Sequence, residues 1–299
     1  MSDGKSGGQP APARMGLRGI AGRVASSRRL SALCIAAMVL VWSPSPTDAQ
    51  QELRPLPWGR DAGGPPPPPV PPGPPPSGPQ PPAAQPTTWK ALLVAGDDAQ
   101  HVFTNAVDTL HRGLTGFGIS PGDIGVLKAD ARTRDTVATM ENLAAQTRTL
   151  SGPANTGCFI FMTSHGQRDA GLYFKRSNAM LPPGYLDQIL DRGCADRPTV
   201  VVTSGCYSGL YVDTPAMRRA NRIVLTAARS DRTSFGCSND YQYTFYDHCF
   251  LDALRQGAPW VAISHRIRAC VERREEQVGA IASFPQTFFG GKVAALTAF

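Results

Sequence analysis

Hydrophobic and polar positions alternate between two periodicities from residue 89 onward. Short apolar runs bounded by polar residues or glycine predict buried β-strands, whereas apolar residues spaced three and four apart predict amphipathic helices. We expect strands at 89–96, 123–130, 157–166 and 222–229, a further strand from 199 into Cys206, and a short β-excursion at 171–177. We expect helices at 105–118, 134–150, 181–192, 243–254 and 260–276.

The part of the chain from residue 88 to 299 has the size and pattern of one α/β domain. Its ~210 residues are enough to build a full hydrophobic core. Because the strands are almost wholly apolar and alternate with helices, they predict a mostly parallel sheet covered on both faces. Ligands of such sheets bind beyond the carboxyl ends of the strands, so functional residues are expected there.

The first 49 residues predict an export signal. They hold six basic and two acidic residues, and an apolar run from Leu30 to Trp42 precedes small residues and Gln50. A basic region, an apolar core and a small-residue site are typical of secretory signals. The run is shorter than the ~20 residues that span a bilayer. We expect an exported protein, periplasmic or secreted, which stays membrane-tethered only if this N-terminal segment remains uncut.

Residues 50–87 predict an extended linker. The stretch GGPPPPPVPPGPPPSGPQPP consists mostly of proline, which lacks an amide donor and has a fixed φ. Such a stretch favours a polyproline spacer and does not build a core. The domain organisation predicted is therefore an export signal over 1–49, a proline-rich linker over 50–87 and one folded domain over 88–299.

Charge and cysteine usage argue against nucleic-acid and zinc sites. The net charge is +7, and the export signal with its six basic and two acidic residues supplies most of it. The remainder is only mildly basic, so we expect no nucleic-acid partner. Six cysteines follow Cys34 and none forms a C-x-x-C pair, which gives zinc little support. If Cys206 is a free thiol, at least one other cysteine is also unpaired.

Two of the expected strands end in residues that carry chemistry. His165 and Gly166 follow the apolar stretch FIFMTS, and Cys206 follows VVVTSG. Parallel neighbouring strands would bring both ends to the same edge of the sheet. An imidazole can take the proton of a thiol and later return it to a leaving amine. Backbone amides at such glycine turns can stabilise a developing oxyanion, so the pair predicts a Cys/His dyad.

Each of these residues also has a purely structural interpretation. A single buried cysteine is more often a packing residue, and a single histidine more often a hydrogen-bonded polar side chain. The joint position of Cys206 and His165 at equivalent strand ends favours chemistry. Ser208 in GCYSG is a weaker candidate nucleophile, because the G-x-S-x-G spacing is missing and Ser208 lies past the strand tip.

The stretches FIFMTSHGQRDAGLYF and VVVTSGCYSG resemble the paired motifs of legumain-like cysteine peptidases of the bacterial type. These peptidases are relatives of caspases, gingipains and the transamidase that attaches lipid anchors. The resemblance covers about residues 89–290. It implies a caspase-like three-layer α/β/α sandwich with a mostly parallel central sheet, and a chemistry that needs no metal or cofactor.

The resemblance also implies roles for individual residues. Cys206 would be the nucleophile and His165 the acid/base. The backbone amides of Gly166 and Cys206 would form the oxyanion hole. No third member of the catalytic group can be named.

A substrate pocket is implied in the same way. Asp247 fits an acidic position of the family's primary specificity pocket, and Ser234 lies in a stretch that lines it. Thr104 and Tyr207 stand where plant and animal legumains have an arginine and an acidic residue, which leaves a preference for asparagine open. A solvated helix residue is an equally weighted interpretation of Asp247.

Together these features predict a cysteine endopeptidase that hydrolyses peptide or protein substrates through a thioester at Cys206. Ligation or transamidation would use the same intermediate with an amine in place of water. The alternative from another class is a non-catalytic caspase-like binding or scaffold domain on a proline-rich stalk. In that alternative the dyad is inert, or a disulfide occupies Cys206. The sequence leaves the disulfide pattern and the oligomeric state open.

Overall fold

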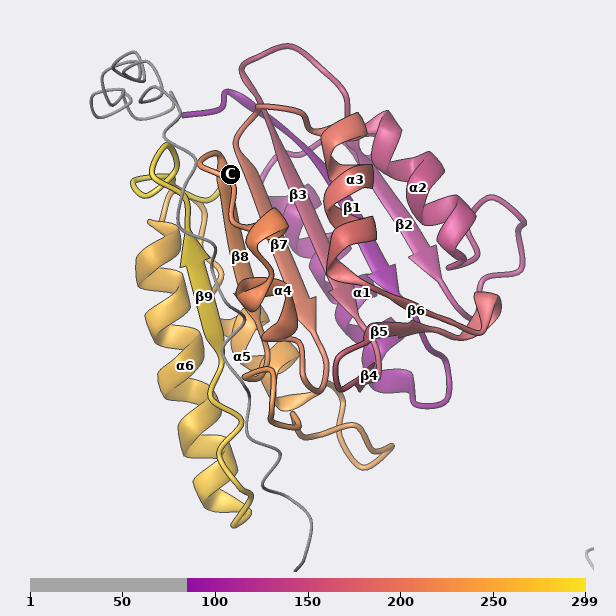
Figure 1. Cartoon of the computed structure of the whole chain (residues 1–299), viewed down its shortest axis with the longest axis vertical. Coiled ribbons are helices and arrows are strands. Elements are labelled where there is room, and N and C mark those ends of the chain that lie inside the picture. The colour runs from indigo at the N-terminus through magenta and orange to yellow at the C-terminus, as the bar shows by residue number, and fades with distance from the viewer. Residues whose placement is uncertain (1–84) are drawn as a thin grey trace, which may run out of the picture. The chain divides into compact units, whose positions relative to one another are not determined.

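The structure is a computed structural model that describes residues 85–299 (Figure 1). The expected export signal over 1–49 and nearly all of the expected linker over 50–87 lie outside the described residues. The fold described below is therefore that of the domain expected from residue 88 onward, and its first strand begins at Thr88.

A six-stranded sheet forms the centre of the described part of the chain, in the order β2-β1-β3-β7-β8-β9. The first five strands in this order are parallel, and β9 pairs antiparallel with β8. The mostly parallel sheet predicted from the sequence is confirmed. The strands are β1 (Thr88–Ala95), β2 (Ile124–Lys128), β3 (Thr156–Thr163), β7 (Thr199–Ser204), β8 (Arg222–Thr226) and β9 (Gln286–Phe289).

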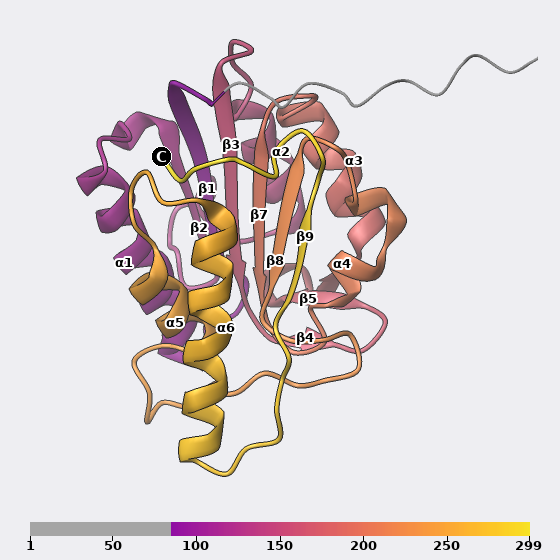
Figure 2. The same cartoon turned by 90° about the vertical axis from the view of Figure 1, so that its left-hand side faces the viewer.

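Helices cover both faces of this sheet and give three layers (Figure 2). The helices on one face are α1 (His101–Gly116), α5 (Phe245–Ala253) and α6 (Trp260–Gln277). Those on the other face are α2 (Met140–Thr149), α3 (Pro183–Gly193) and α4 (Leu210–Asp213). Alternate residues of β3 contact the two apolar cores: Phe159 and Phe161 one, Ile160 and Met162 the other. This is the pattern of a strand buried on both faces.

The helix expected at 134–150 begins only at Met140. Val137 forms a parallel bridge with Lys128 of β2, so the residues before the helix extend the sheet. Thr139 is the N-cap, and its hydroxyl accepts a hydrogen bond from the amide of Asn142 at 3.1 Å. A threonine N-cap satisfies an amide that the helix itself leaves unpaired, which sets the start of α2. The expected start was therefore wrong by several residues.

A small antiparallel sheet follows directly from the carboxyl end of β3. It consists of β4 (Gly166–Gln167), β5 (Gly171–Phe174) and β6 (Ala179–Leu181), and it contains the short β-excursion expected at 171–177. Short 3₁₀ helices lie at Pro121–Asp123, Lys175–Ser177 and Pro215–Met217.

Two disulfides stabilise the described domain. Cys158–Cys194 links β3 to the end of α3, and Cys249–Cys270 links α5 to α6. Among residues 85–299 the free cysteines are Cys206 and Cys237. Cys206 thus has an unpaired companion, as the odd number of remaining cysteines required.

Candidate active site

The candidate site lies at the carboxyl ends of β3 and β7, at the lower end of the sheet in Figure 1. These strands are direct parallel neighbours, and their last paired residues are Thr163 and Ser204. His165 and Cys206 each follow two residues later, so both leave the sheet at the same edge. Both side chains are partly exposed there.

The sulfur of Cys206 contacts the loop that follows β8. The backbone amide of Ser234 donates to Sγ at 3.4 Å, and the Ser234 hydroxyl lies 3.8 Å from it. The thiol in turn lies 3.6 Å from the Ser234 carbonyl oxygen, to which it can donate. Ser234 was expected to line the substrate pocket, and the structure puts it against the sulfur of Cys206.

The imidazole of His165 is held by Gln100, the residue before α1. Nε2 of His165 and Oε1 of Gln100 are 2.7 Å apart, and the edge of the ring meets Phe103 at 5.1 Å between centroids. Because an amide oxygen can only accept, Nε2 carries the proton and Nδ1 keeps its lone pair. Gln100 thus assigns the tautomer that leaves Nδ1 ready to take a proton. Sequence reasoning missed Gln100, although it follows β1, the other neighbour of β3.

Gly166 lies directly against the backbone of Cys206. A Cβ added at Gly166 would be 2.0 Å from the carbonyl oxygen of Cys206, so no larger residue fits here. Gly166 of β4 lies opposite Leu172 of β5, and the amide of Tyr173 donates to the carbonyl of His165 at 2.8 Å. In an antiparallel pair this pattern means that Gly166 and Leu172 do not hydrogen-bond to each other. The amide of Gly166 therefore points away from β5. The amide of Cys206 has no backbone acceptor within residues 85–299.

The turn after the nucleophile is held in an uncommon backbone conformation. Tyr207 has φ of 59°, in the left-handed region that non-glycine residues rarely adopt. Its amide donates to the carbonyl of Arg232 at 2.7 Å, and the guanidinium of Arg168 lies 5.1 Å from the centre of its ring. Such strain persists only where surrounding contacts hold it, and it concentrates at functional sites.

Asp247, near the start of α5, is fully buried beneath this edge. The hydroxyl of Thr163 donates to Oδ2 at 2.7 Å, while Oδ1 has no partner among the described residues. Burial raises the pKa of the Asp247 carboxyl to about 6, and neighbouring hydroxyls oppose this only in part. The interpretation of Asp247 as a solvated helix residue is therefore wrong. Thr104 lies on α1 and is partly buried.

Only one of the two free thiols has the surroundings of a reagent. Burial raises the pKa of the Cys237 thiol to about 12, and the nearby charges of Cys206 and Asp247 add to this shift. Both thiols are partly exposed, but Cys237 packs against the apolar core, whereas the sulfur of Cys206 accepts a hydrogen bond from the amide of Ser234 at the edge of the sheet. Cys206 is therefore the better placed of the two to react.

Other chemistries find no support among the described residues. Ser208 is buried, and its hydroxyl accepts from the amides of Ala227 and Ala228 at 3.0 and 3.2 Å. Ser208 thus joins the nucleophile turn to the end of β8 and is unsuited to attack a substrate. Within residues 85–299 no group of three His, Cys, Asp or Glu side chains is placed to hold a metal ion.

Comparisons with known proteins agree with this arrangement. Residues 134–259, which include His165 and Cys206, match the Peptidase C13 family, that of legumain. Caspase-1 from Spodoptera frugiperda matches the structure with a TM-score of 0.51 at 10% sequence identity, covering 70% of this chain and 88% of that one. No curated protein sequence matches the chain.

The structural match shows the fold alone, because the identity is so low. The caspase-like α/β fold and the resemblance to legumain-like peptidases are both confirmed. Together they indicate cysteine peptidase function in general terms.

Proposed function

We propose that this protein is a cysteine endopeptidase acting through Cys206 and His165. Its fold is caspase-like, and its residues 134–259 match the legumain-type Peptidase C13 family. The observation that carries the proposal is the register of β3 and β7. Each strand ends in a reactive side chain two residues past its last paired position, so an imidazole and a free thiol share one open edge.

The proposed reaction begins with proton transfer from the Cys206 thiol to Nδ1 of His165. The thiolate attacks the carbonyl carbon of the scissile peptide bond and forms a C–S bond. The amides of Gly166 and Cys206 donate to the oxygen that becomes negative. The imidazolium then gives its proton to the leaving amine as the C–N bond breaks. A water molecule, deprotonated by His165, hydrolyses the remaining thioester and releases the acid product.

In the structure, sulfur and imidazole each contact another group. The sulfur contacts Ser234, and the ring of His165 bonds to Gln100. This arrangement fits a resting enzyme, because hydrogen bonds at catalytic groups tighten when substrate is bound. The primary specificity pocket would lie between Cys206 and Asp247, with Ser234 and Tyr207 beside it.

Export is part of the same proposal. The two disulfides, Cys158–Cys194 and Cys249–Cys270, are typical of proteins that function in an oxidising compartment. Over residues 85–299, the structure contains no helix with the length and apolar content that a membrane crossing requires.

Labelling with a thiol-reactive peptide electrophile tests this function. We expect rapid modification of Cys206, mapped by mass spectrometry. Modification should be at least tenfold slower in a His165→Ala variant, because the thiol loses the base that takes its proton. A Cys237→Ala variant is the matched control and should label like the wild type. Absence of labelling in folded protein would instead favour the non-catalytic scaffold domain.

The contact between Gln100 and His165 predicts a positioning effect. Replacing Gln100 with alanine should lower kcat by about tenfold with little change in KM, because the imidazole loses the partner that fixes its tautomer. A Gln100→Glu variant keeps an acceptor oxygen and should recover most of kcat. It should also move the acidic limb of the pH–rate profile upward, since a carboxylate favours the imidazolium.

A matched control for Gln100 is Gln146→Ala on α2, which lies away from the site and should leave kcat unchanged. Equal losses in the Gln100→Ala and Gln100→Glu variants, with unshifted pH profiles, would contradict the positioning role of Gln100.

Asp247 predicts a pH dependence of stability. Its folded-state pKa of about 6 lies above the ordinary 3.8, so the folded protein binds more protons than the unfolded chain between these values. Stability should therefore fall by about 3 kcal/mol as the pH rises from about 3 to 7. Asp247→Asn cannot ionise, so this component should vanish in the variant.

Urea unfolding of both proteins at several pH values measures this effect as the difference between their free energies of unfolding. Asp252→Asn, an exposed residue of the same helix, controls for the change in charge. A difference between wild type and Asp247→Asn that is constant with pH would show that Asp247 ionises normally.

A further inference from the structure

An exposed aromatic residue is held rigidly beside the candidate site. Phe284 precedes β9, is 42% exposed and has φ of 54°, again in the left-handed region. An aromatic side chain in this conformation costs free energy, and a ring this exposed recovers only part of that cost by burial. Packing alone therefore does not explain why an aromatic residue stands at position 284.

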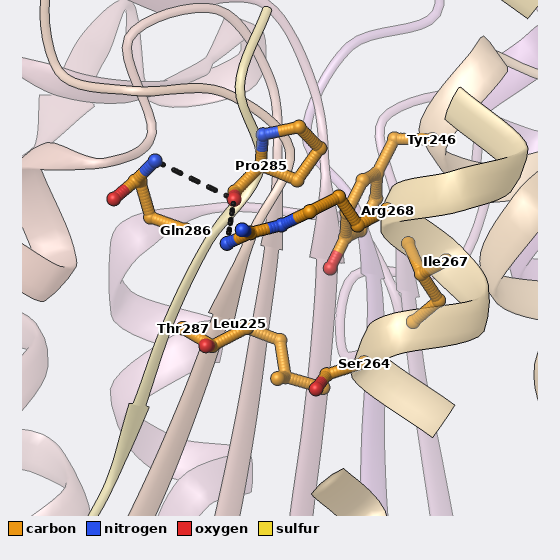
Figure 3. Close-up of a pocket in the computed structure, with 8 residues that line it drawn as sticks. All are labelled: Leu225, Tyr246, Ser264, Ile267, Arg268, Pro285, Gln286 and Thr287. Atoms are coloured by element: carbon orange, nitrogen blue, oxygen red, sulfur yellow. Dashed lines mark hydrogen bonds between the residues drawn. The ribbon is translucent and has the colours of Figure 1, made fainter. Parts of the chain in front are cut away.

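The neighbours of Phe284 are anchored on both sides. Both carboxylate oxygens of the buried Glu275 accept from the amide of Ser283, at 3.2 and 3.1 Å. The carbonyl of Ser283 accepts from the amide of Arg229 at 2.9 Å. On the other side, Arg268 of α6 donates to the carbonyl of Pro285 at 3.2 Å (Figure 3). The chain therefore presents the ring of Phe284 from a fixed backbone.

Three arginines gather around Phe284 and Tyr207. The guanidinium groups of Arg229 and Arg232 lie 5.2 and 5.8 Å from the centre of the Phe284 ring, and that of Arg168 lies 5.1 Å from the centre of the Tyr207 ring. These distances are within cation–π range. We call Arg168, Tyr207, Arg229, Arg232 and Phe284 the arginine–aromatic cluster.

The cluster carries excess positive charge. Its paired carboxylate is that of Asp231, which accepts from Arg229, while the backbone carbonyl of Asp231 accepts from Arg168. Three guanidinium groups therefore face one carboxylate. The excess persists if the exposed Asp169, next to Arg168 in the chain, is counted as well.

The cluster borders the turn that contains Cys206. Arg229, Arg232 and Phe284 come from the loop after β8 and the segment before β9, whereas Arg168 comes from the turn between β4 and β5, three residues after His165. Tyr207 directly follows Cys206, and the carbonyl of Arg232 accepts from the amide of Tyr207. A peptide whose carbonyl reaches Cys206 would therefore also reach the arginines.

We infer that the arginine–aromatic cluster is a substrate subsite for an acidic side chain near the scissile bond, adjacent through Tyr207 to the specificity pocket proposed between Cys206 and Asp247. This inference rests on the proposed peptidase function. Arg229 is held by Asp231, and Arg168 and Arg232 supply the guanidinium donors that match a carboxylate in geometry and charge. The ring of Phe284 supports the arginines and offers an apolar surface to the stem of a glutamate.

Paired peptides test the inference on the full chain. A cleavable sequence from a peptide library is prepared with glutamate or the isosteric glutamine at each of four positions on either side of the cleaved bond. We expect glutamate to raise kcat/KM by roughly fivefold over glutamine at one or two positions, through KM. Added salt should weaken this preference because the cluster is exposed.

Variants assign the preference to the cluster. Arg168→Gln and Arg232→Gln should each bring the glutamate-to-glutamine ratio of kcat/KM close to one, and this ratio is measured within each variant, so it does not depend on the variant's overall activity. Arg266→Gln, an exposed arginine on α6, is the matched control and should keep the wild-type ratio. Arg168 is exposed, so its variant remains informative if replacement of Arg232 impairs folding.

The same peptides, carried on an electrophile, separate failure of the subsite from failure of the function. Labelling of Cys206 at equal rates by the glutamate and glutamine forms would overturn the subsite and leave the peptidase proposal intact. No labelling by either form would overturn both. A preference that survives Arg168→Gln and Arg232→Gln would also overturn the assignment to this cluster.

Discussion

Replacing His165 with alanine is expected to lower kcat/KM for peptide cleavage by about 10⁴-fold, and replacing Cys206 with alanine to abolish cleavage. The imidazole is the base that forms the thiolate and the acid that protonates the leaving amine, so its loss affects two steps. Stability should change little in both variants, because both side chains are partly exposed at the sheet edge and contribute little to the core.

A thermal unfolding measurement and a quenched fluorescent peptide together check this expectation. His265→Ala, at an exposed position on α6, is the matched histidine control and should retain full activity. A His165→Ala variant that is folded and cleaves at more than a tenth of the wild-type rate would show that another group acts as base. The dyad assignment would then be wrong.

Gly166→Ala should be the most damaging single methyl addition at the site. Its Cβ would be 2.0 Å from the carbonyl oxygen of Cys206 and 3.1 Å from the nitrogen of Cys206, both backbone atoms that a side-chain rotation cannot relieve. The turn with the nucleophile must move, and the two amides of the oxyanion hole separate. We expect kcat to fall by about 10³-fold and the free energy of unfolding to fall by about 1–3 kcal/mol.

The control for this variant is Gly113→Ala in the interior of α1, where an added Cβ meets nothing within 4 Å. That substitution should raise stability by about 0.5–1 kcal/mol, because alanine favours a helix over glycine, and should leave kcat unchanged. If the Gly166→Ala variant remained active, the oxyanion would be stabilised by groups other than the amides of Gly166 and Cys206. A variant that loses stability but keeps kcat would restrict Gly166 to a packing role.

The interpretation of Cys206 as a reagent draws on its contrast with Cys237. Both are free thiols in a domain whose other described cysteines form disulfides. Both are partly exposed, but contact with the apolar core raises the pKa of the Cys237 thiol, whereas the sulfur of Cys206 meets the amide of Ser234. Two cysteines of similar sequence context thus differ in reactivity because their surroundings differ.

Local pattern was sufficient for most of the fold. Runs of apolar and β-branched residues predicted every parallel strand, because a strand buried on both faces must be apolar at each position. The strand β9 was missed, since its four residues are only partly buried and its strand character comes from pairing with β8. The late start of α2 was missed for a similar reason: the bridge between Val137 and Lys128 competes with the helix.

The proposed dyad could be predicted because the position of both its residues at one edge of the sheet depends on a rule of topology. His165 and Cys206 each end a predicted parallel strand, and parallel neighbours bring their carboxyl ends to one edge. The partners of the dyad could not be predicted in this way. Gln100 lies 65 residues from His165, Ser234 lies 28 residues from Cys206, and Thr163 lies 84 residues from Asp247.

The sequence by itself thus determined the parallel strands and the two reactive side chains that share one edge of the sheet. Both follow from short-range patterns of hydrophobicity and from the geometry common to parallel sheets. Only the tertiary structure decided that Gln100 contacts His165, that Ser234 contacts Cys206 and that Asp247 is buried. Burial and hydrogen bonding depend on segments that folding brings together, and no local pattern specifies those.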